Sequence, residues 1–259
     1  MYQRATAPQS IGGVLDSGFK LFQACFKETF PLAVAAALVV APFGLVGQSF
    51  VAEPPGAGLA IGFAIGVILL VCVALIFSAA IFARVDAVAN NLELPLGPAL
   101  SYGARCAPAL FVASFLYGLA VMCGLILLII PGIIIGIWLI FAPQITVIER
   151  LGPFAALSRS RQLVRGHWWR TAALITVIGI ILGVLYVILG IVAGIVVALN
   201  PDEILATGAL PWYVDLILNP LLSGVTTPLA YSLFVATFYD LKNRHEGGDI
   251  AERIAAATA

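Results

Sequence analysis

Four arginines and two tryptophans are crowded into one short stretch in the second half of the sequence. They are Arg159, Arg161, Arg165, Arg170, Trp168 and Trp169. Guanidinium groups bind phosphates, and tryptophan side chains prefer the headgroup level of a bilayer. The stretch is therefore a candidate contact for anionic lipid headgroups. A plain topology signal, with the arginines extended into solvent, is the alternative, and the two interpretations are compatible.

A second candidate lies in the last long apolar run, where three polar residues share one helical face. Asn219, Ser223 and Thr226 are four and three residues apart, and Pro220 and Pro228 interrupt the same run. Such a face either lines a cavity or forms hydrogen bonds between helices. The sequence favours hydrogen bonds between helices and leaves the cavity open.

Arg161 falls on the apolar side of a helix expected over residues 154–168. A guanidinium on that side needs a partner, because burying an unpaired charge is costly. Asp240, at the matching end of the last apolar run, is the first choice; Asp86, Glu149 and a lipid phosphate are the alternatives. We therefore predict a structural ion pair between Arg161 and Asp240.

No other residues form a pattern typical of catalysis, metal binding or cofactor binding. The four cysteines stand singly, and His167 and His245 are isolated beside charged residues. The apolar runs hold no ionisable residue away from their ends, whereas ion-coupled transporters place such residues near the middle of the membrane. The sequence therefore predicts a protein that is not an enzyme and has no catalytic, metal or cofactor site.

These residues must be positioned by a chain that is 62% hydrophobic and only 10% charged. A soluble domain carries roughly a quarter charged residues, so a chain this apolar must face lipid. The formal net charge of zero argues against nucleic acid as a partner. The sequence thus predicts an all-α integral membrane protein, with one membrane domain over residues 1–259.

Six apolar runs are candidates to cross a bilayer, which takes about 20 residues of helix. The runs cover residues 30–50, 59–83, 109–130, 133–148, 171–199 and 216–239. The third and fourth adjoin, and Pro131-Gly132 between them predicts a tight turn. The fourth run is short, so whether it crosses fully is open.

The charged residues are divided between the two sides of these runs. All thirteen Lys and Arg residues lie on the side of the two termini. In the segments on the other side the only charged residues are acids: Glu53, Asp202, Glu203 and Asp215. Because Lys and Arg in short loops stay in the cytoplasm, we predict that both termini are cytoplasmic.

Three segments on that side resemble one another, each preceding a pair of spans. They open at Ile11-Gly12, Leu96-Gly97 and Leu151-Gly152. In the first, apolar residues recur at helical spacing opposite charged ones, which is typical of an amphipathic helix in the interface. We predict three cytoplasmic interfacial amphipathic helices, each followed by two spans, as a threefold internal repeat.

Glycines recur every four residues in three of the apolar runs. The sets are Gly58, Gly62 and Gly66, then Gly179 and Gly183, then Gly190 and Gly194. Small residues at this spacing let helices approach closely. The sequence favours such contacts within one chain over contacts between copies.

Two stretches carry a resemblance to a known family. One combines Pro131-Gly132 with the run 149–160 and with 165–169; the other is the C-terminal run 239–249. They resemble the bacterial glycerophosphoryl diester phosphodiesterase membrane-domain family and its uncharacterised relatives. The resemblance implies a place in the bacterial cytoplasmic (inner) membrane. It does not imply the phosphodiesterase activity, because that chemistry belongs to a separate soluble barrel in fused members of the family.

We therefore expect a non-enzymatic inner-membrane protein that organises or contacts membrane lipids or other membrane proteins, with self-association also open. The alternative is a transporter or lipid-moving channel built on the repeats. A cavity lined by Asn219, Ser223 and Thr226 would favour the alternative, and a packed bundle would favour the first.

The sidedness of the basic residues predicts the outcome of reporter fusions. Reporters placed after Lys27, at Asn90 and after Arg244 should report the cytoplasm, and reporters at Pro55 and Asp202 the opposite side. A cytoplasmic signal at Asp202 would contradict the six-span topology.

Overall fold

The computed structural model describes residues 2–52, 56–199 and 214–258, and every regular element in these ranges is a helix. Six helical stretches are long and apolar enough to cross a membrane, as the sequence predicts. They are Ile11–Phe43, Gly58–Ala89, Leu96–Leu127, Ile129–Ile148, Trp168–Ile195 and Leu216–His245. The acids Glu53, Asp202 and Glu203 and the fusion site at Pro55 lie outside the described residues.

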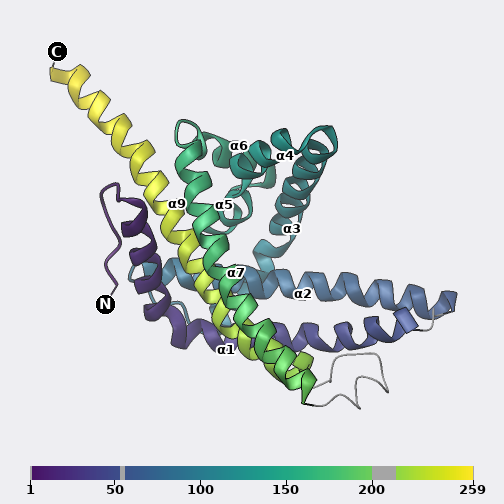
Figure 1. The fold of residues 1–259 in the computed structure, drawn as a ribbon. Coiled ribbons are helices and arrows are strands. Elements are labelled where there is room, and N and C mark those ends of the chain that lie inside the picture. Colours follow the sequence, from purple (N-terminus) through teal and green to yellow (C-terminus); the bar gives the residue numbers. More distant parts are fainter. Residues whose placement is uncertain (1, 53–55, 200–213, 259) are drawn as a thin grey trace.

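The first two helices, α1 (Ile11–Ala52) and α2 (Ala57–Ala89), form a long hairpin (Figure 1). Because α1 is uninterrupted, the expected interfacial helix is not a separate element but the first part of α1. The direction of α1 changes along its length in Figure 1. Pro31 lies inside the helix, where a proline removes a backbone hydrogen bond and bends the axis.

The third helix, α3 (Leu96–Leu127), likewise runs from its expected interfacial start into the span without a break. The chain then reverses at Leu128, which has extended backbone, and not at Pro131-Gly132 as predicted. Pro131 lies instead in the first turn of α4 (Ile129–Leu139). A proline is tolerated there because the first N–H groups of a helix have no partner within it.

The fourth span is broken rather than merely short, because α4 ends at Leu139 and α5 (Ala142–Ile148) continues after a turn. The hydroxyl of Ser160 bonds the backbone on both sides of the break. It donates to the carbonyl of Trp138 at 2.9 Å and accepts from the N–H of Phe141 at 3.2 Å. A hydroxyl can do both at once, and Ser160 is completely buried. The break is therefore a fixed part of the fold.

Of the three expected interfacial helices, only α6 (Pro153–Val164) is an element of its own. It begins at Pro153, a favoured first position, but ends before the expected Trp168. The chain turns there because Arg165 is extended and Gly166 has a φ of +85°, which suits glycine. The next helix, α7 (Trp168–Ala198), starts directly afterwards. The threefold repeat stays a prediction.

The last helix, α9 (Asn219–Thr258), runs through the middle of the molecule and packs most extensively on α1 (Figure 1). A π-helical segment, η1 (Val214–Leu218), precedes it. The ring of Pro220 explains this irregular start, because a proline clashes with the carbonyl four residues earlier. Pro228 lies inside α9.

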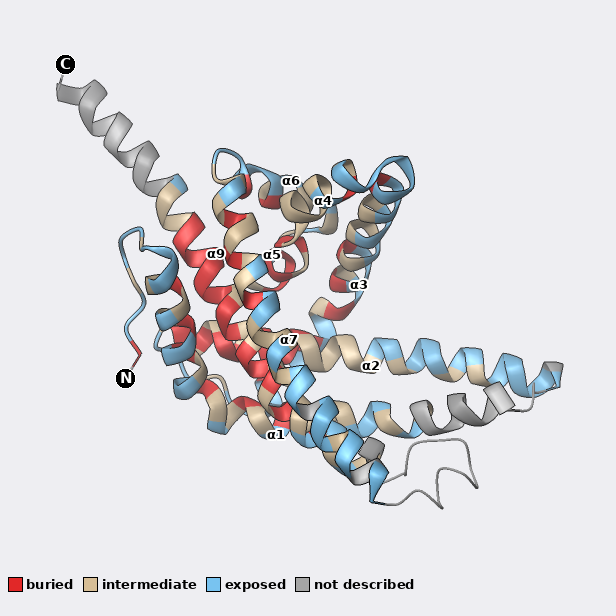
Figure 2. Cartoon of the chain, in the orientation of Figure 1, coloured by how far each residue is buried: buried red, intermediate tan, exposed pale blue. Residues whose placement is uncertain are grey.

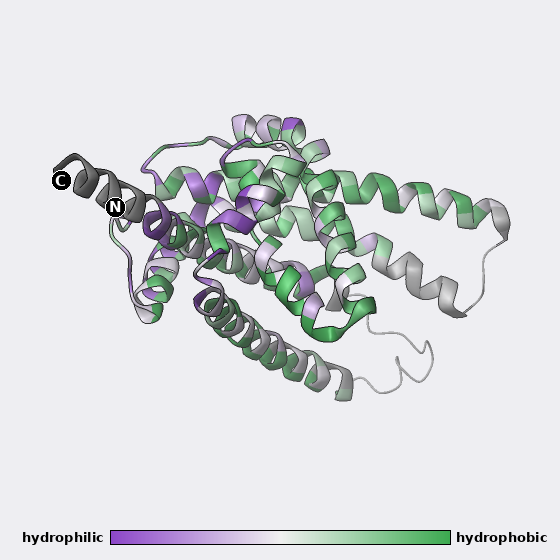
Figure 3. Ribbon diagram, turned by 90° about the horizontal axis from the view of Figure 1, so that it is seen from above, coloured by the Kyte–Doolittle hydropathy of each residue, from purple (hydrophilic) through white to green (hydrophobic). Residues whose placement is uncertain are grey.

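Buried residues gather at one end of the molecule, whereas the outer lengths of α2 and α7 are mostly exposed (Figure 2). Hydrophilic residues gather at the same end, near the two termini (Figure 3). The exposed lengths are apolar: Ile68 on α2 and Val187 on α7 are each 63% exposed. The chain thus packs against itself at its charged end and leaves apolar helix surfaces uncovered.

The glycines spaced four residues apart do not make the contacts within the chain that the sequence favours. A Cβ atom added at six of them would meet nothing within 4 Å among the described residues. These are Gly58, Gly62, Gly179, Gly183, Gly190 and Gly194. Only Gly66 faces another helix, at the ring of Phe43. Among the described residues the expectation is wrong for the other six, because these glycines do not face a neighbouring helix at close range.

Gly103, which is not part of these sets, does mark a close approach of α3 to α2. We expect Gly103→Ala to destabilise the protein, because its Cβ would collide with the carbonyl oxygen of Ile76. Overpacking costs about 1–3 kcal/mol, so the thermal unfolding midpoint in detergent should fall. Gly97→Ala is the control, because it lies on the same helix with nothing within 4 Å. Equal midpoints for the two variants would contradict this interpretation.

Candidate functional site

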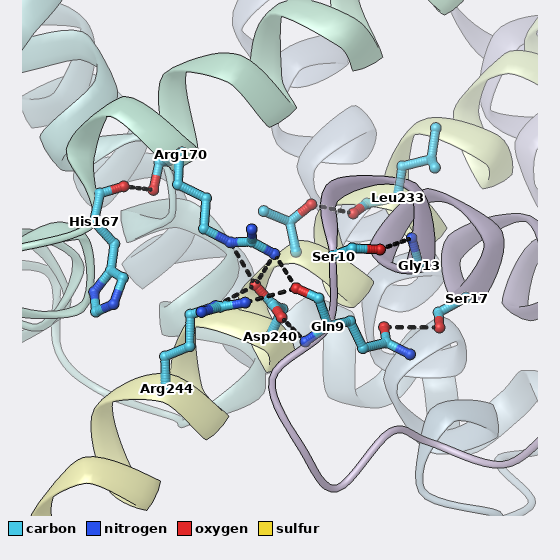
Figure 4. A network of polar contacts seen from close by, with 11 residues as sticks. Gln9, Ser10, Gly13, Ser17, His167, Arg170, Leu233, Asp240 and Arg244 are labelled. Carbon is cyan, nitrogen blue, oxygen red and sulfur yellow. Dashed lines mark hydrogen bonds and ion pairs between the residues drawn. The ribbon is translucent and has the colours of Figure 1, made fainter.

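A buried carboxylate, Asp240 on α9, holds three separate parts of the chain together (Figure 4). Its side chain is 2% exposed. Oδ2 accepts hydrogen bonds from Arg170 on α7, at 2.9 and 3.1 Å, and from Arg244 one turn along α9, at 3.1 Å. Oδ1 accepts from the backbone N–H of Gln9 at 2.8 Å. Both oxygens of the anion are therefore satisfied by charged or backbone donors.

The same two arginines also bind the segment that leads into α1. Arg170 and Arg244 each donate from Nη2 to the carbonyl oxygen of Gln9 at 2.6 Å. The side-chain amide oxygen of Gln9 accepts from the hydroxyl of Ser17 on α1 at 2.9 Å. The backbone of Gln9 is thus held at its N–H and its C=O, which ties the start of α1 to α7 and α9.

Asp240 was expected to pair with Arg161, and the structure gives it Arg170 and Arg244 instead. Arg161 is exposed, and its guanidinium lies 5.2 Å from the ring centroid of Trp138, which is a cation–π contact. The face of α6 that packs inward is not the one predicted to be apolar, because Phe154 is 74% exposed and Trp168 lies in the next helix. The buried residues of α6 are Ala156, Ser160, Leu163 and Val164.

Glu149, directly after α5, forms a second charged centre. Its carboxylate accepts hydrogen bonds from Arg159 on α6 and from Lys242 on α9, both at 3.1 Å. Burial acts to raise the pKa of Glu149, but the hydrogen bonds and charges of Arg159 and Lys242 outweigh it and hold this pKa below its ordinary value. Arg159 therefore serves to tie α6 to the end of α5.

Tyr239, the residue before Asp240, holds α2. Its hydroxyl donates to Oδ1 of Asp86 at 2.6 Å and accepts from the side-chain amide of Asn90 at 2.9 Å. The guanidinium of Arg4 covers its ring, 4.5 Å from the centroid. Sequence reasoning missed this role. The adjacent Tyr239-Asp240 pair was the available signal, because neighbouring residues point about 100° apart on a helix and reach different partners.

An apolar groove of about 550 Å³ lies between α4 and the start of α7. It is lined by Ile130, Ile133, Ile134, Trp138, Arg165, Gly166, Trp168 and Trp169. The four lining residues from α4 are spaced three, four and eight positions from the first, so they share one face of that helix. The groove therefore follows α4 for about 12 Å, at 1.5 Å per residue.

The end of the groove at α7 carries its polar groups. Arg165 is exposed, and its guanidinium has no hydrogen bond or ion pair with any described residue. The rings of Trp168 and Trp169 meet edge to face, with centroids 4.7 Å apart. The indole N–H of Trp168 is buried without an acceptor among the described residues. This end therefore offers a cation beside an apolar channel.

The structure divides the six residues predicted to contact lipid headgroups. Arg165, Trp168 and Trp169 come together at the groove. The other three are engaged by Glu149, by the ring of Trp138 and by Asp240. They are Arg159, Arg161 and Arg170.

A separate cavity of about 390 Å³ lies between α1, α2 and α9. Asn219 and Ser223, two of the three residues proposed as a cavity lining, do line it. Thr226 does not: it is buried, and its hydroxyl donates to the carbonyl of Leu222 at 3.1 Å. Thr227 lines the cavity in its place, because a step of four residues from Ser223 stays closer to the same helical stripe.

The described parts of the chain define an all-helical protein with six helices fit to cross a membrane, fastened together by charged residues at one end. The chain belongs to the family described as Domain of unknown function (DUF7847), whose model matches residues 96–241. The matched part runs from the start of α3 to just beyond Asp240 and contains the α4–α7 groove. No solved structure matches the chain. This match gives no support to a link with the glycerophosphoryl diester phosphodiesterase membrane-domain family.

The contacts of Asp240 predict strong coupling to Arg170 and none to Arg161. Asp240→Asn should lower the free energy of unfolding by about 2–3 kcal/mol, less than the loss of a fully buried pair because both arginines are about a fifth exposed. The double variant Asp240→Asn/Arg170→Gln should lose less free energy of unfolding than the sum of the losses in the two single variants.

Arg161→Gln is the matched control for this cycle, and its effect should add to that of Asp240→Asn. Denaturant titration in detergent measures all five variants. If the stability effects at Asp240 and Arg161 are coupled and those at Asp240 and Arg170 are additive, the pairing expected from the sequence is right and the one described here is wrong.

Proposed function

We propose that this chain is an integral protein of the bacterial cytoplasmic membrane that binds an anionic phospholipid without transforming it. The observation that carries the proposal is the groove between α4 and α7, which is apolar along α4 and has Arg165 and two tryptophans at its α7 end. A phospholipid has the same two parts, an apolar chain and a phosphate, in the same order.

The location of the groove in the chain fits this ligand. Arg165 lies in the connection between α6 and α7, on the side of the spans that holds all thirteen basic residues. If both termini are cytoplasmic, as these residues indicate, Arg165 meets the inner leaflet, which carries the anionic lipids. Trp168 and Trp169 then stand at the headgroup level that tryptophan prefers.

The headgroup rather than the acyl chain decides which lipid binds. An acyl chain is as well solvated in the bilayer as in an apolar groove, so its transfer contributes little. A basic residue near an anionic headgroup contributes about 1 kcal/mol. Arg165 has no competing ion pair among the described residues, so its attraction for an anionic headgroup is available to a ligand. A preference of roughly fivefold for an anionic over a zwitterionic phospholipid follows.

We propose binding without catalysis because the carboxylates at this end of the molecule are already engaged by other residues. Asp240 and Glu149 each bind two cations, and Asp86 accepts from the hydroxyl of Tyr239. Within the described ranges, no three His, Cys, Asp or Glu side chains are grouped so as to hold a metal ion.

Tryptophan fluorescence tests the groove directly, because bromine atoms quench indole rings that they contact. Trp138, Trp168 and Trp169 all line the groove. We expect dibrominated phosphatidylglycerol to quench the purified protein at about one-fifth of the concentration that dibrominated phosphatidylcholine requires.

Arg165→Gln should abolish this preference between the two lipids. Arg105→Gln is the control, because Arg105 is an exposed arginine on α3 that does not line the groove. Equal quenching by the two lipids in the wild type, or an unchanged preference in Arg165→Gln, would contradict the proposal.

The alternative function, a transporter or lipid-moving channel, is favoured by one observation, the cavity that reaches Asn219 and Ser223. Transfer of a fluorescent phospholipid between leaflets of liposomes that contain the protein would support this alternative. The open glycine edges of α7 equally suit contacts with other membrane proteins or with a second copy.

A further inference from the structure

One wall of the cavity between α1, α2 and α9 is polar along its length, and Ser78 of α2 adds a hydroxyl on the opposite side. Asn219, Ser223, Thr227 and Tyr231 line the polar wall at steps of four residues along α9. This spacing keeps the four side chains on one slowly turning stripe, about 18 Å long at 1.5 Å per residue. We call it the α9 polar stripe.

The hydroxyls in the middle of the stripe are free to bind a ligand. The hydroxyls of Ser223 and Thr227 form no hydrogen bond with any residue in the described ranges. Most helix residues of this type in a membrane bond their own backbone or another helix. Thr226 does so, through the carbonyl of Leu222. The two unused hydroxyls therefore differ from their immediate neighbour.

Small side chains keep the opposite wall apart from the stripe. The wall consists mainly of alanines from α1 and α2: Ala33, Ala36, Ala37, Ala41 and Ala74. Larger apolar residues at these positions would fill the space. At one end the ring of Tyr231 stacks on Phe82, with centroids 3.7 Å apart. Towards the other end, Val40 and Asn219 are exposed, so the cavity opens to the surroundings of the helices.

Among the described residues that line the cavity there is no Asp, Glu, Lys, Arg or His. A charged ligand would lose its hydration there without gaining a counter-ion, which is costly. A volume of about 390 Å³ lies within the range of ordinary small-molecule sites. The ligand that fits is uncharged, apolar over most of its length, and carries hydroxyl or ester groups in a row.

We propose that this cavity binds a neutral glycerolipid of the diacylglycerol type, with its hydroxyl and ester oxygens along the α9 polar stripe. The site is separate from the groove between α4 and α7 and shares no lining residue with it. Binding here does not depend on the proposed binding of an anionic phospholipid.

The test is photolabelling of the purified full-length protein in detergent with a diacylglycerol that carries a diazirine on one acyl chain. Labelled peptides should map to α1, α2 and α9 around the cavity. Removing two hydrogen bonds within a membrane, each worth about 0.6 kcal/mol, should raise the half-saturating probe concentration of Ser223→Ala/Thr227→Val about five- to tenfold.

Thr226→Val is the matched control, because it removes a neighbouring hydroxyl that does not line the cavity, and it should label like the wild type. Ala37→Phe, checked for folding by its thermal melt, should fill the cavity and abolish labelling. Arg165→Gln should leave labelling unchanged even if it abolishes the phospholipid preference, so the two proposals fail separately. Equal labelling of the Ser223/Thr227 and Thr226 variants, or displacement of the probe by phosphatidylglycerol at matching concentration, would overturn the proposal.

Discussion

The fold depends on a buried carboxylate that must be surrounded by donors. Asp240 is 2% exposed, and an anion in that position is tolerated only with charged and hydrogen-bonding partners. Arg170 and Arg244 supply the positive charges. The backbone N–H of Gln9 donates to Asp240, and the backbone C=O of Gln9 accepts from both guanidiniums. The start of α1, the start of α7 and the middle of α9 must therefore meet at one place.

This constraint gives the molecule two unlike ends. At the charged end, Tyr239 binds α2 and Glu149 binds the α5–α6 connection to α9. Ser160 bonds the backbone at the break in the fourth span. Away from that end no comparable contacts hold α2 and α7 against the rest of the described chain, and their apolar surfaces stay open. Such surfaces suit lipid, which needs no complementary shape.

The sequence predicts the parts of this structure that follow from composition and from the spacing of apolar residues and prolines. The six apolar stretches and the start of α6 at Pro153 are examples, because hydrophobic length and proline placement act locally. The partners of Asp240 were not predictable in this way. A helical wheel over residues 154–168 places Arg161 on the apolar side, but Phe154 is 74% exposed and Trp168 belongs to α7, so a different face of α6 packs inward. The reversal at Leu128 and the broken fourth span depend on tertiary partners that no local pattern contains.

The proposed binding of an anionic lipid in the groove between α4 and α7 depends on Arg165. Native mass spectrometry of the protein released from its own membrane tests it most directly, because no lipid is supplied by the experimenter. The account predicts one retained anionic phospholipid per chain, enriched over its share of the membrane, and loss of that enrichment in Arg165→Gln. A lipid-free wild-type protein, or bound lipids in the proportions of the bulk membrane, would contradict it.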